Sequence, residues 1–324
     1  IRLSLVGSEM CIRDSYYTFS LWYNFLNGGA ILMEIRILKY FLAVAQEESI
    51  TKAAEILHTT QPNLSRQLNM LEAEVGKKLF ERGSRKVTLT EEGMFLRKRA
   101  KEIIDLTERT ESELSTYGET TSGDIYIGAP ETYVMHSIAE IFKRMHIQYP
   151  NIKYHIFSGS TLEVSEQLNK GLLDFAILIE PIDLEKYNYL KLPYTDTWGV
   201  LMRRDSPLAK LNAITPEDIK DEPIFLAHQQ SSANVLSGWF KEYYRNLNVI
   251  GSFNLITTPA MIVESGLGYV FTFDKLINTT GDCNLCFRPL EPNFETGFYL
   301  VWKKYQIFSR SAKMFLEELQ KVLF

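Results

Sequence analysis

Residues 49–93, SITKAAEILHTTQPNLSRQLNMLEAEVGKKLFERGSRKVTLTEEG, predict a short helix, a tight turn, a second helix and a basic hairpin. Thr51 is expected to cap the first helix, because a threonine hydroxyl can accept a bond from a free amide of the first turn. Ala53, Ala54 and Leu57 are expected on its buried side. The small alanines would let the second helix cross closely over the first.

The second helix of this stretch has one apolar and one polar face. We expect Thr60 to cap it, with Pro62 in the first turn, where a missing N–H costs nothing. The apolar face is formed at spacings of four, three and four by Leu64, Leu68, Leu71 and Val75. The opposite face carries Pro62, Ser65, Arg66, Asn69 and Ala73. A slender polar face with a single charge is typical of a helix that enters a major groove of DNA.

Basic residues gather after Gly76, which ends the second helix. They are Lys77, Lys78, Arg82, Arg85 and Lys86. Such a cluster suits phosphate contacts and a hairpin, or wing, lying beside the groove. The alternative interpretation is a solvated helical hairpin whose charges only keep the protein in solution.

The same stretch closely resembles the winged helix-turn-helix of LysR-type transcriptional regulators. The resemblance is carried by KYFLAVA at 39–45, KAA at 52–54, QPNLSRQ at 61–67, LE at 71–72, LFER at 79–82 and LTEEG at 89–93, and it continues more weakly to the C-terminus. It implies binding to double-stranded promoter DNA. The residues expected to contact DNA are Thr51, Lys52, Gln61, Pro62, Ser65, Arg66, Asn69, Arg85 and Lys86.

The charge distribution supports a basic DNA-reading head on an acidic body. The whole chain of 324 residues has a formal net charge of −5. Residues 33–99 hold 12 Lys and Arg against 9 Asp and Glu, whereas residues 100–324 hold 21 against 29. The length allows two or three domains, and 45% hydrophobic residues can fill their cores.

Residues 1–32 fit poorly with the rest, and we interpret them as an extraneous N-terminal extension, with a genuine extension as the alternative. Glu9, Arg13 and Asp14 interrupt the early apolar stretch, so it does not predict a secretory signal. No apolar run approaches the roughly 18 residues of a membrane span. With three cysteines in all, the chain is expected in the bacterial cytoplasm, without a membrane partner.

Two amphipathic helices are expected to flank the central stretch. Residues 35–46 would complete a three-helix core, and the family pattern begins at Met33. A long helix from Thr90 to about Tyr117 repeats Leu96, Ala100, Ile103, Thr107, Thr110, Leu114 and Tyr117 at coiled-coil spacing. By pattern alone this helix could also pack on its own domain. The resemblance implies a linker helix that pairs subunits in a homodimer or homotetramer.

From Gly123 onward, strands and helices alternate, which predicts an α/β, doubly wound parallel architecture. Expected strands are 124–129, 153–158, 174–179, 198–203, 223–227, 252–256, 268–273, 285–290 and 297–303; expected helices are 132–148, 160–171 and 309–323. The second of these helices should open with a capping box of Ser160 and Glu163.

The family resemblance implies two Rossmann-like lobes, as in periplasmic binding proteins, joined by crossing strands near 192–195 and 292–296. The domains expected from all of these observations are a winged helix-turn-helix at 33–90, a linker helix at 91–118 and an effector-binding domain at 123–324. Lobe I would comprise about 123–193 and 297–324, and lobe II about 194–296.

Two loops that precede helices are candidates for ligand binding, because ligands of such sheets bind beyond the carboxyl ends of strands. They are Pro130-Glu131-Thr132 and Ser158-Gly159-Ser160-Thr161, and plain helix capping is the alternative. The resemblance implies an effector cleft in which Thr132 and Thr161 present hydroxyls. Expected effector contacts are Glu131, Thr132, Ser160, Thr161, His228 and Phe271. The negative charge of Glu131 argues against a simple small carboxylate as effector.

Catalysis finds little support in the sequence. The five histidines show no metal-ligand spacing, and no P-loop, Gly-x-Ser-x-Gly or Gly-x-Gly-x-x-Gly occurs. We therefore expect neither an enzyme nor a cofactor. Cys283-x-x-Cys286 is weak evidence for zinc or redox chemistry, because it has no second pair and no following helix start. The expected function is a regulator controlled by a small-molecule effector, and a redox-sensing regulator using these cysteines is the alternative.

Overall fold

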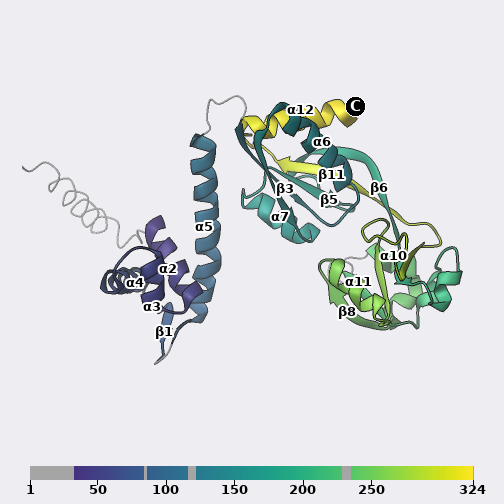
Figure 1. Ribbon diagram of the computed structural model, residues 1–324, viewed down its shortest axis with the longest axis horizontal. Helices are drawn as coiled ribbons and strands as arrows, with labels where there is room; N and C mark the ends of the chain where they lie inside the picture. The colour runs from purple at the N-terminus through teal and green to yellow at the C-terminus, as the bar shows by residue number, and fades with distance from the viewer. Residues whose placement is uncertain (1–32, 84–85, 116–121, 228–234, 324) are drawn as a thin grey trace, which may run out of the picture. The chain divides into compact units, whose positions relative to one another are not determined.

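The computed structural model describes residues 33–83, 86–115, 122–227 and 235–323. The chain divides into two compact units between Thr107 and Glu108, inside the long helix α5 (Glu91–Ser115). Figure 1 labels the elements of both units. Residues 116–121, where the expected linker helix at 91–118 ends, lie outside the described residues.

The first unit is a three-helix core with a two-stranded hairpin. Its elements before α5 are α2 (Ile35–Glu47), α3 (Ile50–Ile56), α4 (Gln61–Val75), β1 (Phe80–Arg82) and β2 (Val87–Leu89). Phe41, Leu64 and Leu71 are fully buried in its core, which explains why α4 turns its apolar face inward. The hairpin strands pair antiparallel, with Phe80 opposite Leu89.

The ends of the helices in this unit follow local side-chain chemistry. Thr60 caps α4 by accepting a bond from the Asn63 amide, as expected, and Gly76 ends the helix with a φ of 68°. The expected cap at Thr51 is wrong. Ser49 caps α3 and accepts from the Lys52 amide at 3.3 Å, so Thr51 lies inside the helix, because the first turn begins two residues earlier than expected.

Helix α5 begins after Thr90, whose hydroxyl accepts from the Gly93 amide at 3.0 Å. The expected seam along this helix is only partly correct. Leu96 and Ala100 pack into the core of the first unit, as the alternative interpretation required for this part of the helix. From Ile103 onward the seam faces solvent, with Ile103 41% and Leu114 66% exposed. Tyr117 lies outside the described residues.

Lobe I of the second unit contains a sheet flanked by helices. Its elements are β3 (Ser122–Ala129), α6 (Met135–Gln148), β4 (Asn151–Ser158), α7 (Thr161–Asn169), β5 (Phe175–Ile179) and α12 (Arg310–Leu323). The predicted capping box of Ser160 and Glu163 is confirmed. The predicted start of α6 at Thr132 is wrong by three residues, because the Val134 amide donates to the Thr132 hydroxyl and holds residues 132–134 in a turn.

Lobe II is built from shorter pieces of helix and strand. They are η1 (Pro207–Lys210), α8 (Pro216–Ile219), β7 (Ile224–Ala227), α10 (Val235–Phe240), η2 (Lys241–Asn246), β8 (Val249–Phe253), α11 (Thr257–Glu264), β9 (Tyr269–Phe273) and β10 (Leu285–Pro289). Strand β9 is buried along its whole length and pairs parallel with β7.

Two long strands, β6 (Tyr187–Arg203) and β11 (Glu295–Lys303), connect the lobes. They pair antiparallel from Tyr187 opposite Lys303 to Thr197 opposite Glu295. The main strand order is β4-β3-β5-β11-β6-β9-β7-β8, and β10 pairs with β6. The expected α/β fold of two lobes joined by crossing strands is confirmed, and its sheet combines parallel pairs, such as β3 with β4, with antiparallel pairs of the crossing strands. The returning strand β11 is antiparallel to β5, because it runs back into lobe I from lobe II.

Candidate functional site

The exposed face of α4 carries the residues expected to read DNA. Gln61, Pro62, Arg66 and Asn69 are exposed, and Ser65 is half-buried on the flank. Leu64, Leu68 and Leu71 hold the opposite face in the core, so this face is fixed in orientation. The exposed groups include an amide, a guanidinium and a proline ring on one helix surface, which is a combination that can contact base edges.

Glu72 ties α4 to the hairpin, a role that the sequence interpretation missed. Its Oε1 accepts from the backbone amides of Leu79 at 2.7 Å and Phe80 at 3.1 Å, and its Oε2 accepts from Lys78 Nζ at 3.0 Å. Burial by itself would raise the pKa of Glu72, but these hydrogen bonds outweigh it and hold the pKa below the usual value. The sequence feature that could have indicated this role is a glutamate next to Leu71, near the end of the apolar face of α4.

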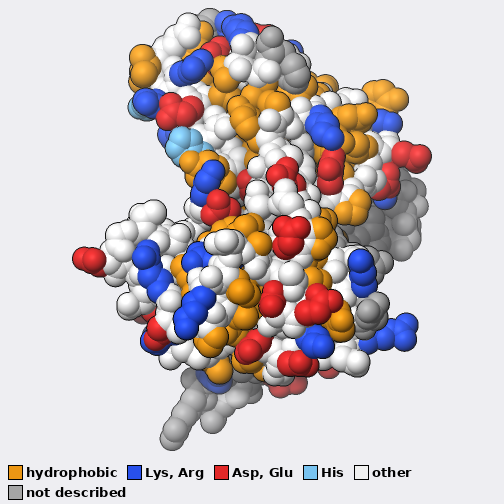
Figure 2. Space-filling view, turned by 90° about the vertical axis from the view of Figure 1, so that its right-hand side faces the viewer, with side chains coloured by type: hydrophobic (Ala, Val, Ile, Leu, Met, Phe, Trp, Pro, Cys, Tyr) orange, Lys and Arg blue, Asp and Glu red, His pale blue; other side chains and the backbone are white. Residues whose placement is uncertain are grey.

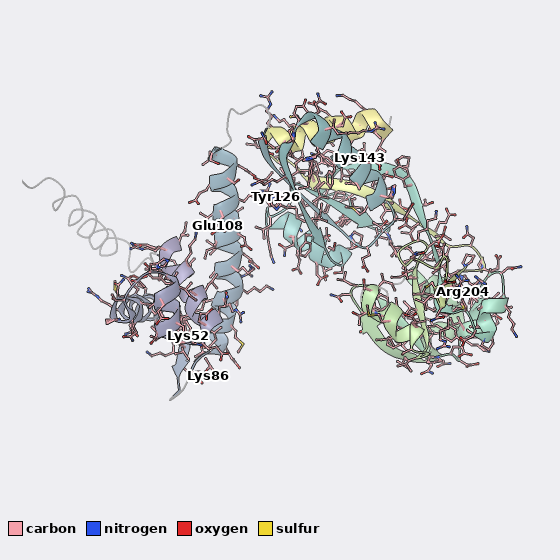
Figure 3. The ribbon with its side chains drawn as sticks, in the orientation of Figure 1. Lys52, Lys86, Glu108, Tyr126, Lys143 and Arg204 are labelled. Carbon is pink, nitrogen blue, oxygen red and sulfur yellow. The ribbon has the colours of Figure 1, made fainter. Side chains whose placement is uncertain are left out.

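The basic residues near the hairpin have different surroundings. Lys52 is exposed on α3, and Thr51 is exposed beside it. Lys86 is exposed but forms an ion pair with Glu48 at 2.9 Å. Figure 3 labels Lys52 and Lys86. Arg85 lies outside the described residues. The structure thus places every predicted DNA contact that it describes on the surface of the first unit.

The second unit holds a cavity of about 360 Å³ between the two lobes. We call this cavity the cleft. Of the predicted effector contacts, Glu131, Ser160, Thr161 and Phe271 line it. Its apolar wall comes from both lobes and includes Ile179, Trp198, Phe253, Ile256, Phe273 and Leu276. His228 lies outside the described residues.

Thr161 and Thr132 differ in how their hydroxyls are used. The Thr161 Oγ1 is buried and has no hydrogen-bond partner in the described structure, although it lies on the wall of the cleft. Thr132 does not line the cleft. Its side chain is 5% exposed, and its hydroxyl donates to Asp196 Oδ2 at 2.5 Å. The expectation that Thr132 presents its hydroxyl to a ligand is therefore not met by this structure, because Asp196 already holds that hydroxyl.

Glu131 connects the two lobes across the cleft. Its Oε2 accepts from the backbone amide of Ile256 at 2.6 Å, at the start of α11. Burial raises the pKa of Glu131, although the hydrogen bond from Ile256 acts in the opposite direction. Glu180, the second carboxylate of the cleft, is instead paired with Lys191 at 3.2 Å.

Figure 2 shows that acidic and basic side chains are interspersed on the visible face of the molecule.

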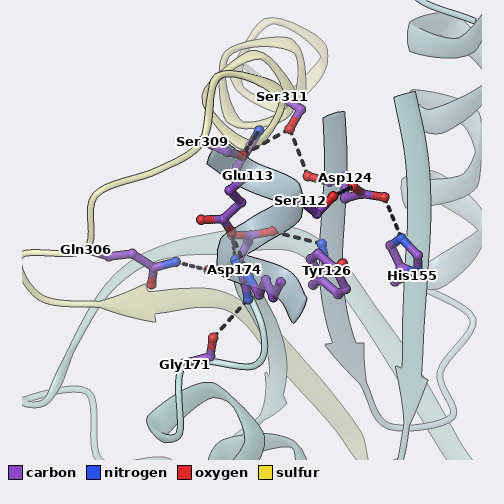
Figure 4. A network of polar contacts seen from close by, with 12 residues as sticks. Ser112, Glu113, Asp124, Tyr126, His155, Gly171, Asp174, Gln306, Ser309 and Ser311 are labelled. Carbon is purple, nitrogen blue, oxygen red and sulfur yellow. Dashed lines mark hydrogen bonds and ion pairs between the residues drawn. The ribbon is translucent and has the colours of Figure 1, made fainter. Parts of the chain in front are cut away.

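The end of α5 is anchored to lobe I by a buried ion pair, as Figure 4 shows. The Arg109 guanidinium binds Asp174, donates to the Gly171 carbonyl at 3.0 Å and lies 4.6 Å from the centre of the Tyr126 ring. Nearby, the Ser112 hydroxyl donates to an oxygen of Asp124 at 2.9 Å. These contacts fix the last turns of α5 on the lobe that supplies Thr161.

The two described cysteines are free thiols, and they occupy the edge of lobe II. Cys286 is buried on β10 and its Sγ donates to the Arg203 carbonyl at 3.8 Å, while burial raises the pKa of its thiol. In the part of the chain that the structure covers, no group of three His, Cys, Asp or Glu could hold a metal ion. Within the same residues, no helix is both long and apolar enough to cross a membrane.

Two family models match this chain. Residues 35–94 match the bacterial regulatory helix-turn-helix protein, lysR family, and residues 118–323 match the LysR substrate binding domain.

Several curated proteins are similar to this chain. The Hca operon transcriptional activator HcaR of Escherichia coli K12 is 28% identical over 279 residues, which span 84% of this chain and 92% of HcaR. The HTH-type transcriptional regulator BsdA of Bacillus subtilis is 32% identical over 73% of this chain and 82% of BsdA. The transcriptional dual regulator OxyR of E. coli K12 is 31% identical over 195 residues, which span 60% of this chain and 63% of OxyR.

The fold is also similar to solved structures. CbnR, a LysR family transcriptional regulator, superposes with a TM-score of 0.72 at 18% identity, over 90% of this chain and all of CbnR. CbnR complexed with its target DNA superposes with a TM-score of 0.69 over 89% of this chain and 99% of CbnR.

Proposed function

Because this chain belongs to the LysR family of transcriptional regulators, we propose that it binds promoter DNA through α4 and the β1–β2 hairpin, and that a small molecule in the cleft changes this binding. The observation that carries the DNA-binding part is the exposed polar face of α4, held outward by three buried leucines. We assign DNA reading to residues 33–90, subunit pairing to 91–118 and effector binding to 123–324. Since promoter DNA is the proposed target, we propose that the protein acts in the cytoplasm.

Arg66 is the residue proposed to read a base edge, because it is the charged residue of the exposed α4 face. Replacing Arg66 with Ala should weaken binding to the native promoter by about 1–3 kcal/mol and reduce the preference over unrelated DNA. The measurement is fluorescence anisotropy with labelled promoter DNA. The matched control is Arg144→Ala, an exposed arginine on α6 of the second unit, which should leave affinity unchanged. Equal promoter affinities for Arg66→Ala and the unmodified protein would refute the assignment.

Exposed lysines beside α4 are proposed to contact phosphates instead. Lys77 is exposed and its nearest ion pair, with Glu92, is long at 3.9 Å. Lys77→Ala should weaken binding to all DNA sequences by the same factor. It should also lower the salt dependence of the binding affinity by the amount expected for about one phosphate contact. The salt slopes of the Lys77 and Arg66 variants therefore distinguish phosphate contact from base reading.

The exposed apolar side of α5 is proposed to pair subunits into a homodimer or homotetramer. Ile103 and Leu114 are large apolar residues that remain exposed on the predicted seam. Ile103→Asp should yield monomers by light scattering and lose cooperative binding to two half-sites. Met94→Asp is the control, because Met94 is exposed nine residues earlier, on the opposite side of the helix. A monomeric unmodified protein would contradict this proposal.

The cleft is proposed to bind the effector. Support comes from an apolar cavity between two lobes whose wall contains the unpartnered Thr161 hydroxyl. Arg109 near the end of α5 binds Asp174 of lobe I, and both residues belong to the second unit. Lobe I is therefore connected directly to the linker helix. A ligand of the cleft should therefore alter promoter affinity, and a promoter-binding titration with and without ligand tests this.

A redox-sensing regulator remains a second candidate because of the similarity to OxyR. The surroundings of the cysteines support it less, since burial raises the pKa of Cys286 and so disfavours the reactive thiolate. If this second candidate is correct, hydrogen peroxide should change promoter binding by the unmodified protein but not by Cys283→Ser. If it is wrong, hydrogen peroxide should not change promoter binding by the unmodified protein.

A further inference from the structure

The charges around the cleft limit the kind of ligand that it can take. Among the lining residues that the structure describes there is no lysine, arginine or histidine, whereas two glutamates are present. A ligand carboxylate is ordinarily bound by a cationic side chain, above all by arginine. An anion in this cleft would instead face Glu131 and Glu180.

One backbone amide at the start of each of two helices beside the cleft is already bonded to a carboxylate of the protein. Helix starts bind anions through free amides and a favourable dipole. At the start of α7, the Ser160 amide donates to Glu163 Oε2 at 2.7 Å. At the start of α11, the Ile256 amide donates to Glu131 Oε2 at 2.6 Å. The protein's own carboxylates thus occupy an anion position on each side of the cleft.

Of the two lining carboxylates, Glu131 is the one suited to a ligand cation. Glu180 already pairs with Lys191, and the combined hydrogen bonds of Lys191 and Tyr299 outweigh its desolvation and lower its pKa. Glu131 has its Ile256 hydrogen bond, and the described residues show no ion pair to it. It is half-buried on the wall of the cleft, where a positive charge would compensate the desolvation of the carboxylate.

The apolar wall indicates the remainder of the ligand. Trp198, Phe271 and Phe273 line the cleft together. The Trp198 and Phe273 ring centres are 4.2 Å apart, and the indole N–H is bonded to Thr296 at 2.6 Å. Trp198 is 4% exposed and its N–H is already bonded, so the part of it that lines the cleft can contact a ligand only through the ring and not as a hydrogen-bond donor. Aromatic surface of this kind favours an aromatic ring and also attracts cations.

We propose that the effector is a small aromatic molecule that carries a positively charged nitrogen, an aryl-alkyl amine in the simplest case. Its nitrogen binds Glu131, its ring packs on Trp198 and Phe273, and the Thr161 hydroxyl accepts or donates one further hydrogen bond. This inference rests on the proposed function of the cleft, and it extends that proposal by naming the class of ligand.

Three probes that share one ring and differ in charge test the inference. They are 2-phenylethylamine, 2-phenylethanol and phenylacetate, titrated into the full chain by isothermal calorimetry. We expect the amine to bind about tenfold or more tightly than the alcohol, because a hydrogen bond to a charged group is stronger than a neutral one. Phenylacetate should bind most weakly. Phenylacetate as the tightest probe, equal affinities, or no binding at millimolar concentration would each overturn the inference.

Two glutamine variants test whether Glu131 provides the preference. Glu131→Gln keeps an oxygen that can accept from the Ile256 amide, so the fold should persist. The affinity of this variant for the amine should fall to its affinity for the alcohol. Glu180→Gln is the matched control and should retain the preference for the amine. An undiminished preference in Glu131→Gln would overturn the role of Glu131. If Glu131→Gln does not fold, the ranking of the three probes on the unmodified protein still decides the ligand class.

Promoter binding measured with the same probes separates this inference from the proposed function. If the amine binds through Glu131 and promoter affinity does not change, the ligand class is supported and the regulatory role of the cleft fails. If phenylacetate binds in the cleft and changes promoter affinity while the amine does not, the regulatory role is supported and the ligand class is wrong.

Discussion

The loop before α6 and the turn that begins α7 each contain a threonine, and their hydroxyls have opposite surroundings. The Thr132 hydroxyl donates to Asp196 Oδ2 and accepts from the Val134 amide. The Thr161 Oγ1 is buried in the wall of the cleft without a partner in the described structure. A partnered buried hydroxyl contributes to folding stability, whereas an unpartnered one costs stability until a ligand supplies the missing bond. The first threonine is therefore expected to serve the fold and the second to serve binding.

Among the substitutions that test this comparison, removal of Asp196 should cause the largest loss of folding stability. Asp196→Ala leaves the Thr132 hydroxyl and the Tyr133 amide without their acceptor in a buried site. The free energy of unfolding should fall by about 3 kcal/mol, measured by urea unfolding followed by tryptophan fluorescence. Asp183→Ala, at an exposed aspartate of the same unit, should change it by less than about 0.5 kcal/mol. An Asp196→Ala variant as stable as the control would mean that the Thr132 loop does not depend on this carboxylate.

A smaller loss is expected when the hydroxyl itself is removed. Thr132→Val keeps the volume but deprives Asp196 of a buried donor, so the free energy of unfolding should fall by about 2 kcal/mol. Thr132→Ser retains the hydroxyl and should recover most of that loss. The affinity of a cleft ligand should be unchanged in both, because Thr132 does not line the cavity. A selective loss of ligand affinity in Thr132→Val would remove the distinction between the two loops.

Features that depend on neighbouring residues could be predicted from the sequence. The Thr60 cap, the capping box of Ser160 and Glu163, and the burial of Leu64, Leu68 and Leu71 follow from spacings of three or four residues. The exposed α4 face followed from the same periodicity. Where two hydroxyls competed for one cap, as at Ser49 and Thr51, local pattern chose the wrong one.

Features that depend on distant residues could not be predicted in this way. The acceptor of the Thr132 hydroxyl is 64 residues away, and the donor to Glu131 is 125 residues away. Nothing in the local sequence distinguishes Thr132 from Thr161, since each precedes or begins a helix after a strand. The strand expected at 198–203 and the crossing expected near 192–195 are parts of one strand, β6. Its full length was not predicted, because its exposed and buried positions change pattern where it passes between the lobes.

Thr161→Val should have little effect on stability and a measurable effect on binding. The substitution removes a buried hydroxyl oxygen that has no partner, so the free energy of unfolding should stay within about 0.5 kcal/mol of the unmodified value or rise. Affinity for 2-phenylethylamine should fall by about 1 kcal/mol, roughly fivefold, if the hydroxyl bonds the ligand. A variant that is destabilised but binds the probe as before would indicate that this hydroxyl is a structural group and that the ligand contacts lie elsewhere in the cleft.

The smallest effect concerns the pH dependence of stability, which should differ between the two loops. Burial raises the pKa of Asp196, even though the bonds from Thr132 and Tyr133 act to lower it. A carboxyl whose folded pKa lies above its unfolded pKa binds more protons in the folded state. Its contribution is fully present below the unfolded pKa and is lost as pH rises through the folded pKa.

Asp196→Asn cannot titrate, yet its amide oxygen can still accept from the Thr132 hydroxyl. The stability of Asp196→Asn relative to that of the unmodified protein should therefore increase as pH rises from below the ordinary aspartate range to neutrality. Thr161→Val should keep the unmodified slope, since the described structure gives the Thr161 hydroxyl no titratable partner. Identical slopes for Asp196→Asn and the unmodified protein would mean that Asp196 titrates alike in the folded and unfolded chains. The Thr132 loop would then lack the desolvated carboxylate that distinguishes it from the Thr161 loop.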